Sequence, residues 1–295
     1  MDLITDPANF YARCLSLRAA GSLGLVPTMG ALHAGHLALV AASRRRDAAT
    51  VATIFVNPTQ FGPREDFARY PRQLQRDGEL LQEAGVQVVF APAPEAIYAG
   101  DAQTRVDVGD LATRLCGASR PGHFAGVATI VLKLFHLAVP THAYFGQKDA
   151  AQVAVLRRMV RDLNVPVELV VEPIVRDADG LALSSRNAYL GAGERRQALA
   201  LVGALRAVAA AVGRGERNPA AALEAGHRGL DAVPGVALEY LAAVDADTLL
   251  PVTEIGPGTL VAVAARVGTT RLIDNLILAD SSSADSSSAD PGASA

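Results

Sequence analysis

Short apolar runs alternate with longer segments of helical periodicity from the N-terminus to about residue 175. Runs of strand length lie at residues 23–26, 51–56, 86–90, 143–145 and 165–174. Segments with apolar residues at helical spacing lie between them, at residues 37–42, 66–84, 124–139 and 150–163. Alternation of this kind predicts an α/β fold, with a parallel sheet covered by helices on both faces.

The pattern changes after about residue 175. Two helices are expected at residues 194–212 and 219–230, and they are followed by strands at 236–244, 259–267 and 272–278. The turn residues 268–271 predict an antiparallel hairpin between the last two strands. We therefore expect a first domain over 1–175 and a smaller α+β domain over 176–280. The serine-rich repeat at 281–295 is expected to be disordered, because it has too little apolar surface to bury.

Composition narrows the class of protein. The 295 residues carry a formal net charge of −3 without a long basic block, which argues against a nucleic-acid surface. Only two cysteines are present, Cys14 and Cys116, as is typical of a reducing compartment. The N-terminus has no signal-peptide pattern, and the apolar stretch 127–139 is too short to span a bilayer. We expect a soluble cytoplasmic protein that does not engage a membrane.

The most informative motif is the stretch 27–36, which connects a predicted strand to the predicted helix that follows it. It holds His33 and His36, whose spacing of three places both imidazoles on one side of the first helical turn. Backbone N–H groups at a helix start favour anions, and each imidazole can donate a hydrogen bond to a phosphoryl oxygen. A protonated ring would add charge. The alternatives are ordinary capping histidines or a zinc site, although the two cysteines have no ligand-like spacing.

Two further clusters follow predicted strands. Asn57 and Gln60 carry side-chain amides suited to a small polar substrate, although the same residues could simply form a turn. Gly146, Lys148 and Asp149 open the helix that also carries Gln152. The glycine permits close approach or unusual backbone angles, the lysine offers an ammonium to phosphate, and the aspartate is a candidate helix cap.

A fourth cluster, Ser184-Ser185-Arg186, has two hydroxyls and a guanidinium able to clasp a polyphosphate. Asp77 lies in a predicted helix, where most aspartates are solvated, but its carboxylate could hold Mg²⁺. Arg120 could reach a substrate carboxylate, and His123 could cap or support the next helix.

Together and in this order, the clusters resemble the pantothenate synthetase (pantoate–β-alanine ligase) family over residues 1–279. That family belongs to the nucleotidyltransferase superfamily. In this resemblance His33 and His36 correspond to the HIGH signature, and the Ser184–Arg186 loop stands where relatives carry KMSKS. The resemblance implies a Rossmann-type, doubly wound first domain, a smaller C-terminal domain that acts as a lid, and a homodimer.

The implied reaction uses MgATP in two steps. The carboxylate of pantoate forms pantoyl adenylate and pyrophosphate, and the amine of β-alanine then releases AMP and pantothenate. The resemblance implies catalytic roles for His33, His36, Lys148, Ser184, Ser185 and Arg186. It implies that ATP also contacts Pro27, Thr28, Met29, Gly30, Gly146, Gln147, Asp149, Val175 and Leu183. It implies that the two small substrates contact Pro27, Met29, Asn57, Gln60 and Gln152. From their own chemistry, Arg120 is expected to bind a substrate carboxylate and Asp77 to be a magnesium ligand.

Three positions depart from the family pattern. Gln147 replaces the usual glutamate, Ala150 the following tyrosine, and Leu183 the methionine before Ser-Ser-Arg. None of them removes a group with an assigned chemical role, so activity is expected to survive. The alternatives are an adenylyltransferase of the same superfamily, or a non-catalytic nucleotide-binding module.

Overall fold

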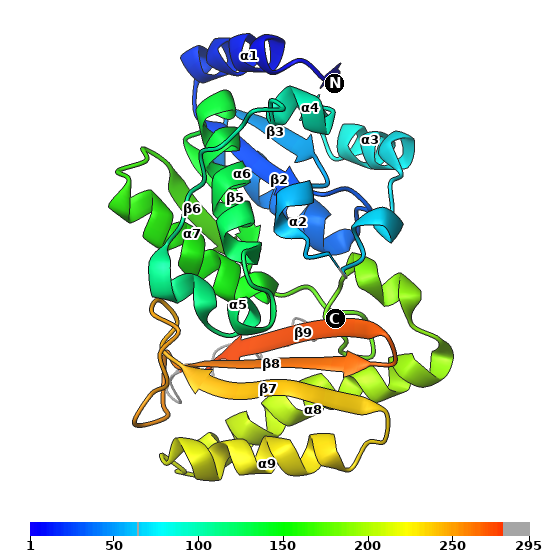
Figure 1. Cartoon of the computed structure of the whole chain (residues 1–295), viewed down its shortest axis with the longest axis vertical. Helices are drawn as coiled ribbons and strands as arrows, with labels where there is room; N and C mark the ends of the chain where they lie inside the picture. Colours follow the sequence, from blue (N-terminus) through cyan, green and yellow to red (C-terminus); the bar gives the residue numbers. More distant parts are fainter. Residues whose placement is uncertain (64, 280–295) are drawn as a thin grey trace, which may run out of the picture. The chain divides into compact units, whose positions relative to one another are not determined.

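The computed structural model describes residues 1–63 and 65–279, so the expected disorder of 281–295 lies outside the described residues. The chain folds into two compact units (Figure 1). Unit 1 comprises Met1–Tyr189, and unit 2 begins at Leu190.

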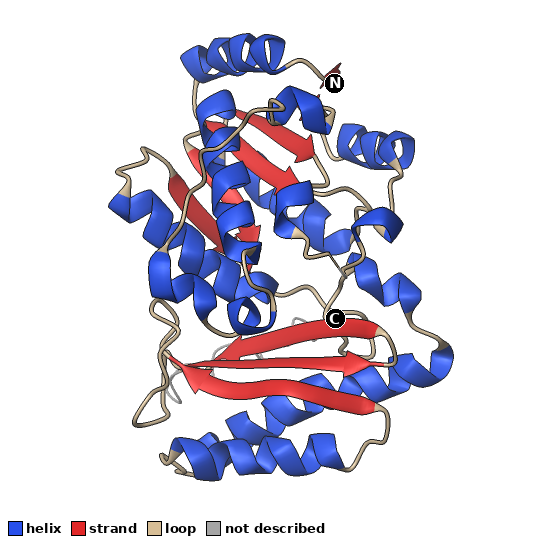
Figure 2. Ribbon diagram, in the orientation of Figure 1, coloured by secondary structure: helices blue, strands red, loops and turns tan. Residues whose placement is uncertain are grey.

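Unit 1 is built on a six-stranded parallel sheet, drawn as red arrows among blue helices in Figure 2. The strands lie in the order β1-β4-β3-β2-β5-β6. Their bounds are β1 (Asp2–Ile4), β2 (Leu23–Thr28), β3 (Ala49–Ile54), β4 (Val88–Phe90), β5 (His142–Gly146) and β6 (Glu168–Glu172). The expected α/β class with a parallel sheet is confirmed.

Helices cover both faces of this sheet. The longer ones are α1 (Pro7–Ala20), α2 (Ala34–Arg46), α3 (Leu74–Glu83), α6 (His123–Ala138) and α7 (Ala150–Asp162), with two single-turn helices, α4 (Pro94–Ile97) and α5 (Cys116–Ser119). Helix α6 contacts both α1 and α7. Across the sheet, the chain moves in one direction from β2 to β3 to β4 and in the other direction from β4 to β5 to β6. Right-handed crossovers therefore place α2 and α3 on the face opposite to that of α6 and α7.

The strand order creates a switch point between β2 and β5. The chain leaves β2 toward β3 on one side, while β5 is the neighbour of β2 on the other side and leads on to β6. In open α/β sheets, ligands bind in the crevice outside the carboxyl ends of such strands. The segments that follow β2 and β5 carry the two histidines and Lys148, so the topology brings these groups to one sheet edge.

A buried carboxylate at the C-terminal end of α2 connects this helix to β5. Asp47, the C-cap residue, accepts hydrogen bonds from the Tyr144 hydroxyl and from His142 Nδ1, each at 2.6 Å. Gly24 leaves room for this contact, since a Cβ there would overlap Ser43 and Asp47. Helix α2 is thereby tied to β5 as well as to β2.

Two local expectations for unit 1 differ from the structure. The helix expected over 66–84 begins only at Leu74, because Pro71 interrupts it; a 3-10 turn at Phe67–Arg69 precedes the proline. The pattern also missed β1 and α1. The strand has only three residues, and Asp6 caps the helix by accepting a hydrogen bond from the Asn9 N–H.

Unit 2 pairs two helices with an antiparallel sheet of order β7-β8-β9. Its elements are α8 (Ala192–Gly213), α9 (Pro219–Asp231), β7 (Val236–Val244), β8 (Leu260–Val267) and β9 (Thr270–Ile277). The expected hairpin joins β8 and β9, and Gly268 provides its left-handed residue with φ of 57°. Among the described residues, α8 is the one helix long and apolar enough to cross a membrane. That is weak evidence for a span, because the buried side chains of α8 are those of a core helix.

The boundary between the units lies later than the expected 175/176. Residues 176–189 fold with unit 1, because Arg176 pairs with Ala182 in a short bridge and Ser185 bonds to the loop after β2. The Ser-Ser-Arg motif is therefore part of unit 1.

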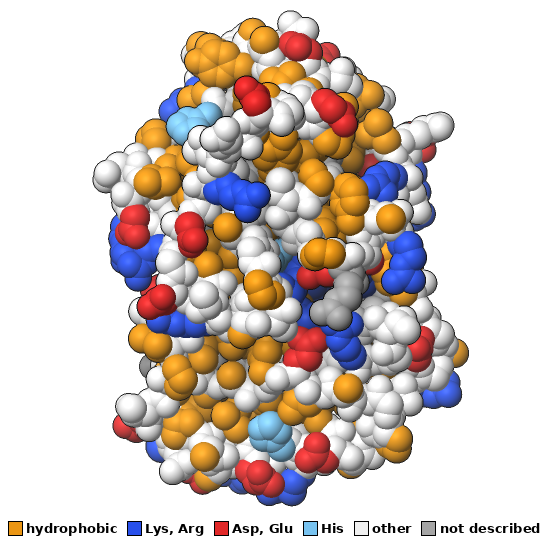
Figure 3. Space-filling model, viewed as in Figure 1, with side chains coloured by type: hydrophobic (Ala, Val, Ile, Leu, Met, Phe, Trp, Pro, Cys, Tyr) orange, Lys and Arg blue, Asp and Glu red, His pale blue; other side chains and the backbone are white. Residues whose placement is uncertain are grey.

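On the face drawn in Figure 3, acidic and basic side chains are interspersed with hydrophobic ones.

Candidate active site

A pocket in unit 1 lies at the carboxyl ends of β2, β5 and β6. Many of the expected catalytic, nucleotide-binding and substrate-binding residues line it: Pro27, His33, His36, Gly146, Lys148, Asp149, Gln152, Val175, Leu183, Ser184, Ser185 and Arg186. These residues come from three separate stretches of the sequence. The sheet edge and the following loops bring them together.

The two histidines occupy the first turn of α2. His33 is the N-cap residue, and its Nδ1 accepts a hydrogen bond from the Gly35 N–H at 3.2 Å. Nδ1 of His36 accepts from the His33 N–H at 3.3 Å. Because both Nδ1 atoms accept, both rings are neutral tautomers that carry their proton on Nε2. Capping and ligand binding are thus compatible here, since Nε2 remains a donor.

Burial keeps these imidazoles uncharged. It lowers the pKa of His33 to about 4, with the charge of Lys148 acting in the same direction. Burial and the neighbouring His33 ring lower the pKa of His36 to about 3. The charge of Asp149 opposes both shifts without outweighing them. The expectation that a protonated ring adds positive charge is therefore not supported; the histidines supply directed N–H groups.

The loop after β5 contributes Lys148, Asp149 and, one turn into α7, Gln152. Asp149 stands at the N-cap position of α7 but makes no capping hydrogen bond through its side chain. Gly146 has ordinary extended backbone angles, so of the two expected reasons for a glycine here, close approach and unusual dihedrals, only close approach fits the structure. Nothing lies within 4 Å of the place where a Cβ would stand, which leaves the backbone open to close approach. Gln147 begins the short turn between β5 and α7.

The Ser-Ser-Arg loop is joined to the histidine loop. The Ser185 hydroxyl donates to the Ala31 carbonyl at 3.2 Å, and the Ser184 hydroxyl accepts from the Arg186 N–H at 3.3 Å. Leu183 N–H donates to the Val175 carbonyl at 3.0 Å, which holds the two lining residues together. Arg186 Nε and Nη2 both donate to the Asp66 carboxylate at 2.9 Å.

Asn57 lies outside the pocket lining and is committed to structure. Its side-chain NH₂ donates to Gln60 Oε1 at 3.0 Å and to the Gly126 carbonyl at 3.2 Å, while Oδ1 accepts from the hydroxyls of Thr59 and Tyr98. With 1 % of its surface exposed, it is not placed for direct contact with β-alanine. Its hydrogen bond to Gln60 Oε1 instead fixes the orientation of the Gln60 amide.

Gln60 in turn reaches the loop after β2. Its Nε2 lies 3.1 Å from the sulfur of Met29, so these two expected substrate residues do meet. The expected nucleotide contacts Thr28 and Gly30 have internal roles. The Thr28 hydroxyl donates to the Thr53 carbonyl, and the Gly30 N–H donates to the Thr28 hydroxyl.

Arg120 is already paired. Its Nε and Nη2 donate to the two oxygens of Glu65 at 2.8 and 2.6 Å. His123 is buried behind it, with Nδ1 at 2.8 Å from the Gln60 carbonyl. Burial, aided by the charge of Arg120, lowers the pKa of His123 to about 4. The expected contact of Arg120 with a substrate carboxylate would require it to leave Glu65, whereas the expected supporting role of His123 fits its contacts.

Asp77 does not fit the expected role of magnesium ligand. It is buried in α3, and its two oxygens accept the N–H groups of Ala31 and Leu32 at 2.8 and 2.9 Å. The loop needs this support because Gly30 and Ala31 have φ of 82° and 51°. Within residues 1–63 and 65–279, no cluster of three His, Cys, Asp or Glu side chains is arranged to hold a metal ion.

Sequence reasoning missed several residues of the site. Tyr70, Tyr144 and Phe145 line the pocket, and Asp66 holds its arginine. The aromatic residues look like core or loop residues in sequence. Asp66 has its partner 120 positions later, and no local pattern indicates a contact over that distance.

The fold and the pocket define a class. A doubly wound sheet with neutral imidazole donors, a lysine and an arginine at its switch point is a nucleotide-binding α/β enzyme with a polyphosphate site. Comparison with known proteins makes this specific. Residues 2–277 match the pantoate-beta-alanine ligase family, and the chain belongs to that family.

The sequence matches to known relatives extend over nearly the full length of both chains. The chain is 52 % identical to a pantothenate synthetase of Koribacter versatilis, covering 94 % of this chain and 96 % of that one. It is 54 % identical to one of Moorella thermoacetica, with 94 % and 99 % covered. A crystal structure of the pantothenate synthetase of Thermus thermophilus superposes with a TM-score of 0.91 at 50 % identity, covering 95 % and 100 % of the two chains.

A more distant structure carries ligands. The pantoate-beta-alanine ligase of Francisella tularensis, complexed with beta-gamma ATP and beta-alanine, superposes with a TM-score of 0.79 at 32 % identity, with 94 % and 97 % covered. The expected family and the expected class, an ATP-dependent ligase of pantothenate biosynthesis, are thereby confirmed. Neither the adenylyltransferase nor the non-catalytic module is favoured.

Proposed function

We propose that the pocket of unit 1 condenses pantoate with β-alanine in two half-reactions. In the first, a carboxylate oxygen of pantoate attacks the α-phosphorus of ATP, and the bond to the β-phosphate oxygen breaks to release pyrophosphate. In the second, the amine of β-alanine attacks the acyl carbon of the adenylate, and AMP leaves. The observation that carries this assignment is the convergence of His33, Lys148 and Arg186 on one pocket.

The phosphate side of the reaction needs alignment and charge more than a nucleophile. His33 and His36 each present a neutral Nε2–H, so they direct hydrogen bonds to phosphate oxygens without adding charge. Lys148 and Arg186 supply the positive charge that stabilises pyrophosphate as it departs. The Ser184 hydroxyl, which accepts from the Arg186 N–H, keeps its own proton for a phosphate oxygen, whereas the Ser185 hydroxyl donates to the Ala31 carbonyl and holds the loop in place.

The small substrates would take the side of the pocket near Pro27 and Gln152. Gln152 and Gln60 offer amide donors and acceptors to the hydroxyl and carboxylate groups of pantoate. Gln60 is held by Asn57 on one side and contacts Met29 on the other. Asn57 therefore serves the substrate indirectly, by fixing the Gln60 amide.

Magnesium would enter as part of the substrate MgATP. Both oxygens of Asp77 accept hydrogen bonds from backbone N–H groups, and the described residues offer no cluster of metal ligands. Mg²⁺ commonly keeps several waters and binds mainly through substrate phosphates. The pocket residues therefore bind and orient the nucleotide, and no resident metal is assigned to the chain.

Family membership also supports three properties of the whole protein. We infer a cytoplasmic enzyme, a homodimer, and a C-terminal domain that acts as a lid. Sedimentation of the purified chain tests the second of these, with a mass near twice 30.6 kDa as the expected result.

Pantoate-dependent exchange of pyrophosphate into ATP tests the assignment, because it reports the first half-reaction alone. The informative variant is His33→Asn. Asparagine is a good N-cap residue, so helix α2 keeps its cap while the imidazole donor is lost. We expect a decrease in exchange of about 100-fold or more, by analogy with removal of one transition-state donor, with little change in melting temperature.

His136→Ala is the matched control, because His136 is exposed on α6 and lies outside the pocket. It should exchange pyrophosphate at the wild-type rate. Near-normal exchange in His33→Asn would refute the role of the histidine. AMP formation that does not require both pantoate and β-alanine would refute the ligase reaction itself.

A further inference from the structure

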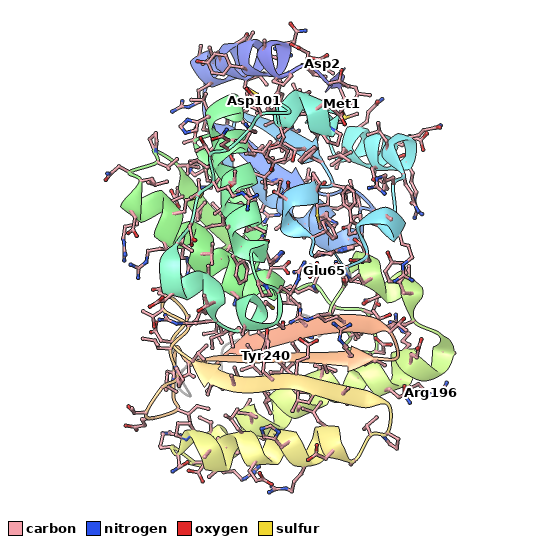
Figure 4. All side chains as sticks on the ribbon, viewed as in Figure 1. Met1, Asp2, Glu65, Asp101, Arg196 and Tyr240 are labelled. Atoms are coloured by element: carbon pink, nitrogen blue, oxygen red, sulfur yellow. The ribbon has the colours of Figure 1, made fainter. Side chains whose placement is uncertain are left out.

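Two consecutive carboxylates, Glu65 and Asp66, each hold an arginine in a two-pronged ion pair. Arg120 donates to Glu65 at 2.8 and 2.6 Å, and Arg186 donates to Asp66 through two bonds of 2.9 Å. Glu65 is labelled in Figure 4, on the loop between β3 and α3. Of the two arginines, Arg186 lines the pocket and Arg120 lies outside it. The pairs thus have similar geometry but different positions relative to the site.

The Asp66–Arg186 pair is well shielded from water. The side chains are 13 % and 29 % exposed. Burial alone would raise the pKa of Asp66, but hydrogen bonding and the charge of Arg186 outweigh it and lower that pKa. Burial likewise opposes the charge on Arg186, and the Asp66 hydrogen bonds more than compensate, so its pKa is raised. Both groups are charged, and the carboxylate neutralises the guanidinium.

A bound polyphosphate and Asp66 compete for the same guanidinium. Arginine recognises phosphate through the same planar fork of N–H donors that it offers to a carboxylate. A carboxylate beside a polyphosphate is also repelled by it, and that repulsion is strong where water is scarce. We propose that Asp66 is a counter-ion that positions Arg186 and is displaced by the phosphates of ATP. This rests on the proposed role of Arg186 in binding the nucleotide.

The displacement would remove one of the contacts that hold segment 65–72 in place. This segment contacts the pocket side through Asp66 and Tyr70, and the Tyr70 ring lies 6.0 Å from the Arg186 guanidinium carbon. The Arg69 carbonyl adds a third contact, because it accepts a hydrogen bond from the Tyr189 hydroxyl at 3.2 Å. Tyr70 also shares a hydrogen bond with Ser185. The Glu65–Arg120 pair would remain as the second anchor. ATP binding is thereby coupled to segment 65–72, which follows the loop that carries Gln60.

Calorimetric titration with MgATP in the absence of pantoate tests the displacement, because no turnover occurs. Asp66→Asn removes the competing charge while keeping the size of the side chain. We expect its Kd for ATP to fall by about twofold to fivefold, as for the loss of one partly exposed ion pair. Glu65→Gln is the matched control: it removes the neighbouring carboxylate but leaves Arg186 paired, so its Kd should stay within about twofold of wild type.

A second comparison isolates Arg186. In an Arg186→Gln background, Asp66→Asn should no longer tighten ATP binding, because the guanidinium for which the two anions compete is gone. Hydrogen exchange on the unaltered chain gives an independent readout that requires no variant to fold. On addition of MgATP, amides of segment 65–72 should exchange faster, while those at residues 146–152 should exchange more slowly.

The outcomes separate this inference from the proposed function. If the wild-type chain binds ATP but Asp66→Asn binds it equally or more weakly, the displacement is wrong and the ligase assignment stands. Unchanged or increased protection of segment 65–72 also overturns the displacement. A wild-type chain that does not bind ATP at all overturns both.

Discussion

The imidazoles of His33 and His36 are held in a fixed orientation at the start of α2. Their Nδ1 atoms are engaged by backbone N–H groups, and burial disfavours the charged rings. The spacing of the two residues in sequence was enough to predict a pair on one side of a helix start. Their protonation state could not be predicted, because it depends on how deeply the loop is buried and on the lysine at position 148.

Nuclear magnetic resonance of ¹⁵N-labelled histidine tests this protonation state. At pH 7 both residues should give the pattern of a neutral ring protonated at Nε2, and neither should titrate as the pH falls from 7 to 5. The reason is that their pKa values are lowered to about 4 and about 3. A His33 or His36 signal that titrates near pH 6.5 contradicts the burial argument.

Asp77 tests whether a buried carboxylate supports the histidine loop or holds a metal. Asp77→Asn offers only one good acceptor to the two N–H groups of Ala31 and Leu32. We expect the free energy of unfolding to fall by about 1–3 kcal/mol. Pyrophosphate exchange should fall roughly tenfold or more as the histidines lose their position.

The metal dependence decides between the two roles of Asp77. The Mg²⁺ concentration that gives half-maximal exchange should be the same in Asp77→Asn and in wild type. A large increase in that concentration would restore the metal-ligand role. Glu79→Gln, on the exposed side of the same helix, should change stability by no more than about 0.5 kcal/mol.

At the scale of elements, the close contact between α6 and the loop after β3 positions Gln60, a proposed substrate contact. Gly126 on α6 faces this loop, where an added Cβ would overlap the Thr59 carbonyl and lie 2.8 Å from Gln60 Cα. The Gly126 carbonyl also accepts a hydrogen bond from Asn57. The absence of a side chain at 126 therefore lets helix and loop meet.

Gly126→Ala should push this helix and loop apart. Alanine is the better helix former, but overlap with backbone outweighs that gain, so we expect a loss of about 1–3 kcal/mol in unfolding free energy. Because Gln60 shifts with the loop, the KM for pantoate should rise more than the KM for ATP. Gly203→Ala is the control: position 203 is exposed on α8 with open space around it, so it should gain up to about 1 kcal/mol. Equal stability of the two variants would contradict the contact.

The elements were predictable to the extent that each had its own periodic pattern. Helices α6, α7 and α8 and most strands of both sheets lie close to their expected positions. The helix expected over 66–84 was too long because Pro71 outweighs the apolar spacing before it. The role of Asp77 on that helix was missed because its partners lie 45 and 46 positions earlier. Helical spacing alone cannot identify such partners.

At the scale of the whole chain, the order of four short motifs was sufficient to identify the family. Each motif follows a predicted strand or lies at the expected domain junction, and parallel topology then brings them to one edge. The boundary between units was placed too early, since the Ser-Ser-Arg loop is bonded to Ala31, which belongs to unit 1. The ion pairs of Asp66 and Glu65 were not foreseeable, because they join residues 120 and 55 positions apart.

The uncharged state of the two imidazoles has a physiological consequence. Donors that do not ionise near neutrality cannot serve as an acid sensor, and they draw in no counter-ions of their own. Mild acidification would then leave this side of the pocket unaltered. Affinity for nucleotide on this side should therefore be insensitive to small changes in pH.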